Sequence, residues 1–195
     1  LIYNAAVLAS LVKNPQGHAL YVFPLKALEQ DQYDELKSLI YAIGGEIRAE
    51  IYDGDTKPHK RQNIKKNPPH ILITTPDMLH SGILAFREQW ESFFRDLQFI
   101  VLDELHTYSG IFGSHILHLI RRLNRICTSC GSTPQYITCS ATIGNPAEFA
   151  HKIFNREFTA ITKSGAPTAK KHFLFLNPPE SPNTVAAHLL QTSVS

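Results

Sequence analysis

The sequence predicts an α/β fold in which a mainly parallel sheet carries helices on both faces. Short segments rich in β-branched and aromatic residues alternate with helical patterns along most of the 195 residues. The segment 99–102 is apolar throughout, as expected of a strand buried on both faces. It ends abruptly in Asp103 and Glu104. Two carboxylates therefore lie at the carboxyl end of a strand, where open α/β sheets bind their ligands.

The predicted elements alternate in order along the chain. A helix over 1–12 is already in progress at the first residue, so we expect the sequence to be a fragment of a longer protein. Strands are predicted at 19–23, 47–52, 71–74, 99–102 and 135–139. Helices are predicted at 25–42, 56–67, 76–94 with a break, and 113–127. The last helix has one apolar stripe, which predicts core packing.

The carboxyl-terminal part differs in character from the rest. The segments 165–167 and 170–171 are typical of a linker, a further strand is predicted at 172–176, and another helix begins near Thr184. We therefore expect one domain over 1–164, and a linker with the start of a second domain over 165–195.

Composition excludes several classes of protein. The chain is 43% hydrophobic and 18% charged, which suits an ordinary globular core. No apolar run approaches the roughly 18 residues that span a bilayer, and no signal peptide is apparent. We expect an intracellular protein with no membrane partner, cytoplasmic in a prokaryote and nuclear in a eukaryote. The pair Cys127 and Cys130 is either a zinc or redox motif or two small residues near a helix end.

A net charge of +2 means that any nucleic-acid surface must be local. One candidate is the lysine-rich segment 57–66. The other is a face of the helix 113–127, where His115, His118, Arg122 and Arg125 recur at helical spacing. Each is either a solvated helix face or a phosphate-binding surface.

Five segments, taken in order, resemble motifs of superfamily 2 DEAD/DEAH-box helicases. The segment 21–32 is similar to motif Ia, Gly44 and Gly45 to the glycine pair that follows, and 74–79 to motif Ib. The segment 103–106 is similar to motif II and 140–142 to motif III. The resemblance covers nearly the whole chain. It implies the RecA-like three-layer fold of P-loop NTPases, here without the strand that carries the phosphate-binding loop.

A narrower resemblance lies in 108–115 and 121–125, together with 165–167 and 177–179. These segments are similar to RecQ-like DNA-repair helicases of the mitomycin repair type, which carry a C-terminal zinc-binding domain. The resemblance implies an ATP-dependent 3′ to 5′ DNA helicase that acts in repair. Its cofactors would be ATP and Mg²⁺.

The resemblance also assigns the catalytic residues. Asp103 would hold Mg²⁺ through water, and Glu104 would orient or deprotonate the attacking water. From the residues alone, this acid pair is equally well explained as part of a polar turn that ends the strand. His106 would couple the nucleotide site to motif III. Ser140 and Thr142 would hydrogen-bond to motif II, or cap the helix that follows.

Nucleic acid would lie across the carboxyl edge of the sheet, held through phosphates at loops and helix starts. The expected partners are single-stranded or forked DNA, with RNA possible, and a second RecA-like domain of the same chain. Gly44 and Gly45 are equally explained by a turn after a helix. The expected contact residues are Pro24, Lys26, Gly44, Gly45, Thr74, Thr75, Asp77 and Arg122.

The phosphate-binding loop Gly-x-x-x-x-Gly-Lys-Ser/Thr is absent from the 195 residues. We therefore expect the chain alone not to hydrolyse ATP, and the longer protein to do so. Two alternatives stay open. One is a non-catalytic nucleic-acid-binding module, and the other is an RNA helicase of the same superfamily.

Overall fold

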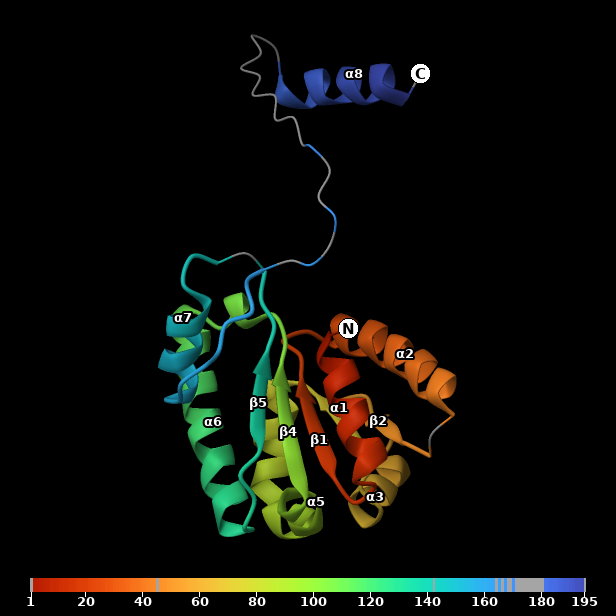
Figure 1. Ribbon diagram of the computed structural model, residues 1–195, viewed down its shortest axis with the longest axis vertical. Coiled ribbons are helices and arrows are strands. Elements are labelled where there is room, and N and C mark those ends of the chain that lie inside the picture. The colour runs from red at the N-terminus through yellow and green to blue at the C-terminus, as the bar shows by residue number, and fades with distance from the viewer. Residues whose placement is uncertain are drawn as a thin grey trace. The chain divides into compact units, whose positions relative to one another are not determined.

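The computed structural model describes residues 2–44, 46–141, 143–163, 165, 167, 170 and 181–194. Within these residues one five-stranded sheet has the order β2-β3-β1-β4-β5 (Figure 1). Every neighbouring pair of strands is parallel, which confirms the predicted fold class. The strands are β1 (His18–Val22), β2 (Ala49–Ile51), β3 (Ile71–Thr74), β4 (Leu97–Leu102) and β5 (Gln135–Thr138).

Helices connect these strands. The segment between β3 and β4 contains a short α-helix, a π-helix, a 3-10 helix and a further α-helix, named α4, η1, η2 and α5. The remaining 3-10 helix, η3, follows β4 directly. The helices are α1 (Ile2–Lys13), α2 (Lys26–Ile43), α3 (Pro58–Lys66), α4 (Pro76–Met78), η1 (Leu79–Ile83), η2 (Leu84–Trp90), α5 (Glu91–Arg95), η3 (Leu105–Thr107), α6 (Gly110–Ser129), α7 (Pro146–Phe154) and α8 (Pro182–Val194).

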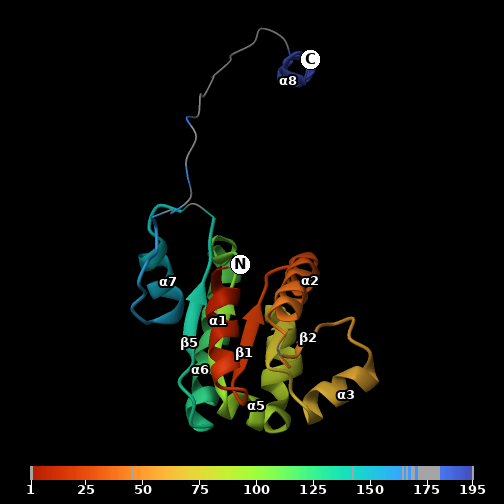
Figure 2. The same cartoon turned by 45° about the vertical axis from the view of Figure 1, so that its right-hand side comes forward.

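The sheet separates two hydrophobic cores, because alternate residues of each strand point to opposite faces. Ala19 and Tyr21 of β1 pack with α1 and α2, while Leu20 and Val22 pack with the helices of the other face. That second core contains α5, α6 and α7 and includes the fully buried Trp90. Figure 2 shows α1 and α6 on opposite sides of the strands. The molecule is therefore the three-layer arrangement expected of a RecA-like domain.

Most predicted boundaries agree with the structure to within a few residues, and the predicted strand 71–74 coincides with β3. The helix expected at 113–127 begins earlier, at Gly110. The break expected within 76–94 is the irregular run from η1 to η2. A Cβ at Gly82 in this run would lie 2.1 Å from Met78 Cε, so a larger residue there would require the flexible Met78 side chain to move.

After β1 and after β4 the chain turns to opposite faces of the sheet. The helix after β1 is α2, which packs on the α1 face, and the helix after β4 is α6, which packs on the other. Since β1 and β4 are neighbours, the position between their carboxyl ends, here called the crevice, is where open α/β sheets commonly bind ligands. Asp103, which directly follows β4, lies beside this position.

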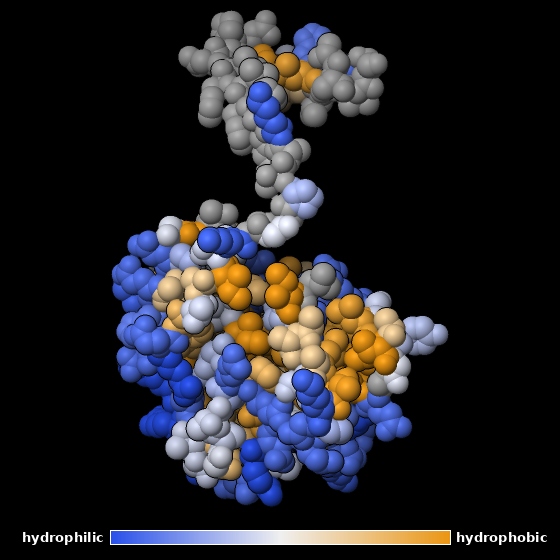
Figure 3. Space-filling view, in the orientation of Figure 1, coloured by the Kyte–Doolittle hydropathy of each residue, from blue (hydrophilic) through white to orange (hydrophobic). Residues whose placement is uncertain are grey.

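Hydrophobic side chains gather on the surface over α1 and α2 (Figure 3). Ile2, Leu25 and Tyr41 are among the large apolar side chains that are exposed in this part of the chain. Apolar surface of this kind is typical of faces that contact other protein.

The chain divides into two compact units, Leu1–Ala160 and Ile161–Ser195. In the second unit, α8 contains the helix predicted near Thr184. The strand predicted at 172–176 lies outside the described residues, and the assignment of 165–195 to a second domain stays a prediction. No helix in the described part of the chain has the length and apolar character needed to cross a membrane.

Candidate functional site

A sharp turn at the end of β4 presents Asp103 and Glu104. The Asp103 amide donates to the carbonyl oxygen of Val22 at 3.3 Å, which joins the two strand ends. Glu104 adopts a left-handed conformation with φ 52°, which is uncommon for a residue other than glycine. Its amide donates to Asp103 Oδ1 at 2.8 Å and so stabilises the turn. Strained backbone that the surroundings hold in place is often found at functional sites.

Tyr3 of α1 contacts the Asp103 carboxylate. Its hydroxyl lies 3.0 Å from Asp103 Oδ2 and 2.8 Å from Gln32 Oε1, and its one proton serves one acceptor at a time. Burial, reinforced by the Asp103 charge, raises the pKa of Tyr3 far above its usual value, so the hydroxyl remains a donor. Asp103 is only half-buried. Oδ1 accepts from the Glu104 amide, Oδ2 accepts from Tyr3 when that hydroxyl turns toward it, and both oxygens keep capacity for water.

His106 links Glu104 to the segment after β5. Its Nδ1 lies 3.3 Å from Glu104 Oε2 and 3.3 Å from the Ala141 amide nitrogen. A protonated Nδ1 donates to Glu104, whereas an unprotonated Nδ1 accepts from Ala141. The backbone adds a fixed link, because the Leu105 amide donates to the Cys139 carbonyl oxygen at 2.8 Å. The protonation of one ring nitrogen thus selects between the two contacts.

The hydroxyl residues expected in motif III are Ser140 and Thr142. Ser140 is exposed, and no hydrogen bond of its side chain is found in the described part of the structure. Thr142 lies outside the described residues. The helix that follows, α7, begins at Pro146 with Asn145 as its N-cap and no side-chain cap hydrogen bond. Asn145 thus takes the N-cap position instead of Ser140, and the motif III role of Ser140 and Thr142 stays a prediction.

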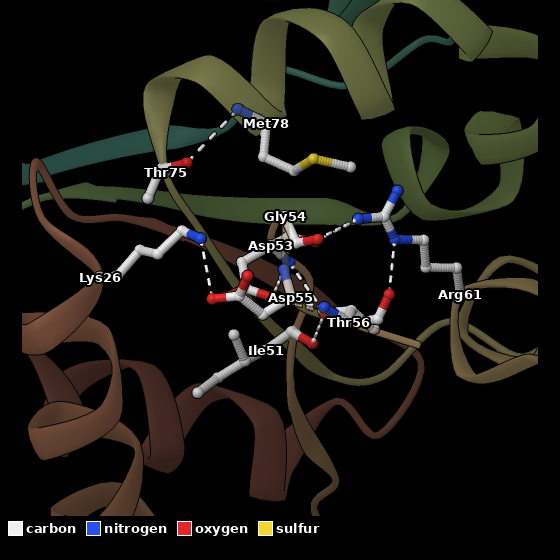
Figure 4. A network of polar contacts seen from close by, with 9 residues as sticks. All are labelled: Lys26, Ile51, Asp53, Gly54, Asp55, Thr56, Arg61, Thr75 and Met78. Carbon is white, nitrogen blue, oxygen red and sulfur yellow. Dashed lines mark hydrogen bonds and ion pairs between the residues drawn. The ribbon is translucent and has the colours of Figure 1, made fainter. Parts of the chain in front are cut away.

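Lys26 and the loop after β2 form a polar network beside the crevice (Figure 4). Lys26 Nζ lies 2.8 Å from Asp55 Oδ2, and both side chains are largely exposed. Gly54 lies close to the same lysine, because a Cβ there would be 3.3 Å from Nζ. Lys26 begins α2, and Leu25 before it makes no side-chain cap. The start of this helix therefore combines a lysine with amide groups that no side chain caps.

Hydrogen bonds hold the loop 53–56 from two sides, its own Asp53 and Arg61 of α3. Asp53 Oδ1 accepts from the amides of Asp55 and Thr56 at 3.0 and 2.8 Å. Arg61 of α3 donates to the carbonyl oxygens of Asp53, Gly54 and Thr56, each at 2.8 Å. These contacts hold the loop that faces Lys26 in place.

Thr74 and Thr75 have different roles at the end of β3. Thr74 is fully buried and donates to the Tyr52 carbonyl oxygen at 2.7 Å, so its hydroxyl serves the fold. Thr75 is the N-cap of α4, and its hydroxyl accepts from the Met78 amide at 3.3 Å. Asp77 in the same turn is exposed.

Gly44 lies apart from these residues. It is the left-handed C-cap of α2, with φ 64°, and its amide donates to the Tyr41 carbonyl oxygen. The 18 residues of α2 place Gly44 ~27 Å from Lys26. Gly45 lies outside the described residues. The structure brings Gly54, rather than Gly44, to the loops at the carboxyl edge of the sheet.

The Arg122 guanidinium makes contacts within the fold. Its Nη2 donates to the Leu84 carbonyl oxygen at 2.9 Å, and its Nη1 lies 3.3 Å from His80 Nδ1. These contacts connect α6 to the segment between β3 and β4. Arg122 is therefore not grouped with Lys26, although it lines a groove that begins at Pro76 and Asp77.

Glu29, in the first turn of α2, is buried, and neither carboxyl oxygen has a hydrogen-bond partner among the described residues. Burial, with a further contribution from Asp53, raises the pKa of Glu29 to about 8, while Lys26 opposes the shift. Nothing in the sequence pattern distinguished Glu29 from the exposed acids of the same helix. Tyr3 was also missed, because 100 residues separate it from Asp103.

The pair Cys127 and Cys130 lies at the end of α6. Burial raises the pKa of Cys127 to about 11, which disfavours the thiolate that zinc or redox chemistry needs. No group of three potential metal ligands occurs in the described residues. Mg²⁺ bound with nucleotide needs few protein ligands, since it retains water and phosphate oxygens. The Asp103 carboxylate fits such a site.

Comparison with known proteins gives consistent matches. A profile of the family "DEAD/DEAH box helicase" matches residues 1–149. The uncharacterized ATP-dependent helicase YprA of Bacillus subtilis is 49% identical over 92% of this chain, which spans 24% of that protein. The ATP-dependent helicase HRQ1 of Saccharomyces cerevisiae is 41% identical over 93% of this chain, which spans 17% of that protein. The chain thus spans a quarter or less of these relatives.

A solved structure shares the same fold. The crystal structure of the DUF1998 helicase MrfA bound to DNA and AMPPNP superposes with a TM-score of 0.91 and 45% sequence identity. The match covers 98% of this chain and 27% of that one.

Proposed function

We propose a function from one premise: this chain belongs to the DEAD/DEAH box helicase family. Within a longer protein it would form the first RecA-like domain of an ATP-dependent helicase that moves along DNA. The observation that carries this proposal is the turn after β4, where Asp103, Glu104 and His106 lie at the crevice between β1 and β4. YprA and HRQ1, which are named ATP-dependent helicases, support the choice of ATP.

Each residue of the turn has a proposed task. When bound, Mg²⁺ would neutralise charge on the nucleotide phosphates, and Asp103 would hold its water shell. Tyr3 would orient the Asp103 carboxylate through its hydrogen bond. Glu104 would orient the attacking water. His106 contacts both Glu104 and Ala141, so it would couple changes at this site to the segment after β5.

Phosphates of the nucleic acid would contact the loops at the carboxyl edge. Lys26 supplies the charge, the start of α2 supplies amides, and Thr75 with Asp77 forms the second loop. The Lys26–Asp55 pair would open on binding, since a phosphate competes with Asp55 for the ammonium group. DNA is the proposed polymer because MrfA, at 45% identity, is a helicase solved with DNA. Binding of this kind is independent of sequence and weakens with salt.

The test is a Glu104→Gln variant of the full-length protein. We expect ATP hydrolysis to fall at least ~100-fold, while ATP binding, followed by a fluorescent analogue, stays within a few-fold of normal. Glu46→Gln, at an exposed site, is the matched control. Hydrolysis at a near-normal rate in Glu104→Gln would exclude the assigned role.

A second measurement distinguishes DNA from RNA. Single-stranded DNA should stimulate the ATPase of the full-length protein more than RNA of the same length. Unwinding of partial duplexes with 3′ or 5′ tails then tests the 3′ to 5′ direction. Equal or greater stimulation by RNA would support an RNA helicase instead.

A further inference from the structure

A large groove lies outside the crevice, between the start of α4, one face of α6 and the end of α7. Its volume is about 1070 Å³. Asp77 and His80, Phe112 and the arginines of α6, and Arg156 after α7 all line it. All of these residues lie within the first compact unit. The groove is therefore a property of a single folded body.

The charged side chains that line the groove are mostly positive. Arg121, Arg122, Arg125 and Arg156 all line it, and Asp77 is its one carboxylate. Among the described residues, none of these arginines forms an ion pair. Like charges four residues apart on a helix, such as Arg121 and Arg125, destabilise it unless a partner compensates them. The groove thus has the charge pattern expected of a surface that binds a polyanion.

Some of the arginines are held in place within the fold. Arg122 donates to the Leu84 carbonyl oxygen, and the Arg156 guanidinium lies 5.3 Å from the centre of the Tyr136 ring. Arg121 and Arg125 are instead exposed and directed away from the core. The two exposed arginines are therefore the groups most available to a ligand.

The groove lining also includes apolar surface. Phe112 is 40% exposed, and its ring packs 5.7 Å from that of Tyr108. Ile116 and Leu119 also line the groove but are buried, so Phe112 is the exposed large apolar side chain of the lining. Aromatic rings beside arginines are typical of surfaces that bind single-stranded nucleic acid, in which bases stack and phosphates pair with charge.

The groove is continuous with the phosphate contacts proposed above. Pro76 and Asp77, which line its entrance, directly follow Thr75 at the N-cap of α4. A strand that passes Thr75 therefore reaches the groove without leaving the protein surface. We propose that the groove binds the continuation of the single strand beyond Thr75, with Arg121 and Arg125 on its phosphates and Phe112 against a base. This inference rests on the proposed function.

The test uses the full-length protein and oligothymidylates of ~6 and ~12 nucleotides, a range typical of single-strand sites. The variant is the double substitution Arg121→Gln and Arg125→Gln. We expect the dissociation constant for the longer strand to rise about tenfold or more, and its salt slope to fall by ~1.4. Affinity for the shorter strand should change less than twofold. The control, Lys13→Gln with Arg95→Gln, removes two exposed charges that do not line the groove.

A Lys26→Gln variant separates the two proposals. It should weaken binding of both lengths, because Lys26 belongs to the first contact surface. If it does so while the arginine variant matches its control, the groove proposal alone fails. If Lys26→Gln changes neither length and DNA does not stimulate the ATPase, the proposed function fails.

A different occupant would give a different result. If another domain of the same protein covers the groove, the arginine variant should lower the thermal unfolding temperature and leave both DNA affinities unchanged. That result would overturn the proposal. Photocrosslinking of a strand that carries 5-iodouridine should label Phe112 if a base packs there, and labelling that spares α6 would also contradict it.

Discussion

At the scale of single residues, Glu29 is a buried acid without a hydrogen-bond partner among the described residues. Its pKa of about 8 in the folded protein lies well above the usual value of 4.5. The folded state therefore binds the proton more tightly than the unfolded state does. The Glu29 contribution to stability is present at low pH and is lost as pH rises towards 8.

We predict that Glu29→Gln will flatten this dependence. Between pH 5 and 8, the difference in free energy of unfolding between variant and parent should grow in favour of the variant. The limit of this slope is ~1.4 kcal/mol per pH unit. Urea denaturation across the pH range measures it, with Glu46→Gln as the exposed control. Parallel curves for parent and variant would show that Glu29 is ionised in the folded protein.

Glu29 and Tyr3 also show what the sequence pattern could not provide. Asp103 and Glu104 were predictable because an apolar run ended in two acids. Their partner Tyr3 comes from a helix 100 residues away, so no local spacing indicates the contact. The burial of Glu29 likewise depends on how α2 packs. Local patterns predict which residues end a strand, whereas long-range packing decides what surrounds them.

At the scale of elements, the strands and helices were predictable because their hydrophobic periods are regular. The start of α6 was not, since its first turn has two glycines, Gly110 and Gly113, in place of a periodic apolar face. Gly110 has φ 59°, a conformation that favours glycine. The glycine pair at 44 and 45 was assigned from its place in the sequence, but the length of α2 carries Gly44 away from the carboxyl edge.

Gly113 gives a prediction at this scale. A Cβ there would lie 2.4 Å from the Tyr108 carbonyl oxygen, a backbone atom that cannot easily move. We expect Gly113→Ala to lower the free energy of unfolding by ~1–3 kcal/mol. Gly144→Ala is the matched control, because a Cβ at Gly144 meets nothing within 4 Å. Equal stability of the two variants in urea would show that the start of α6 adjusts freely.

At the scale of the whole first unit, one sheet joins two cores. Leu11 of α1 lies in one core and Leu123 of α6 in the other, and both are fully buried. Because every strand contributes side chains to one or both faces, loss of packing on one face should destabilise the other. The two cores are thus expected to unfold together.

We predict that Leu11→Ala and Leu123→Ala will each lower the free energy of unfolding by ~2–5 kcal/mol. Each should shift a single transition by the same amount whether it is followed by circular dichroism or by Trp90 fluorescence. Trp90 lies in the same core as Leu123 and across the sheet from Leu11. A shift of the circular dichroism signal alone in Leu11→Ala would show that the two faces unfold separately.

The position of β5 at one end of the strand order has a consequence for handling the protein. Among the described strands β5 pairs only with β4, so its other side presents unpaired backbone amides and carbonyls. Its sequence Gln-Tyr-Ile-Thr contains no charge or proline, the features that usually prevent edge-to-edge association. Solutions of this chain are therefore expected to lose monomer to strand addition as concentration rises.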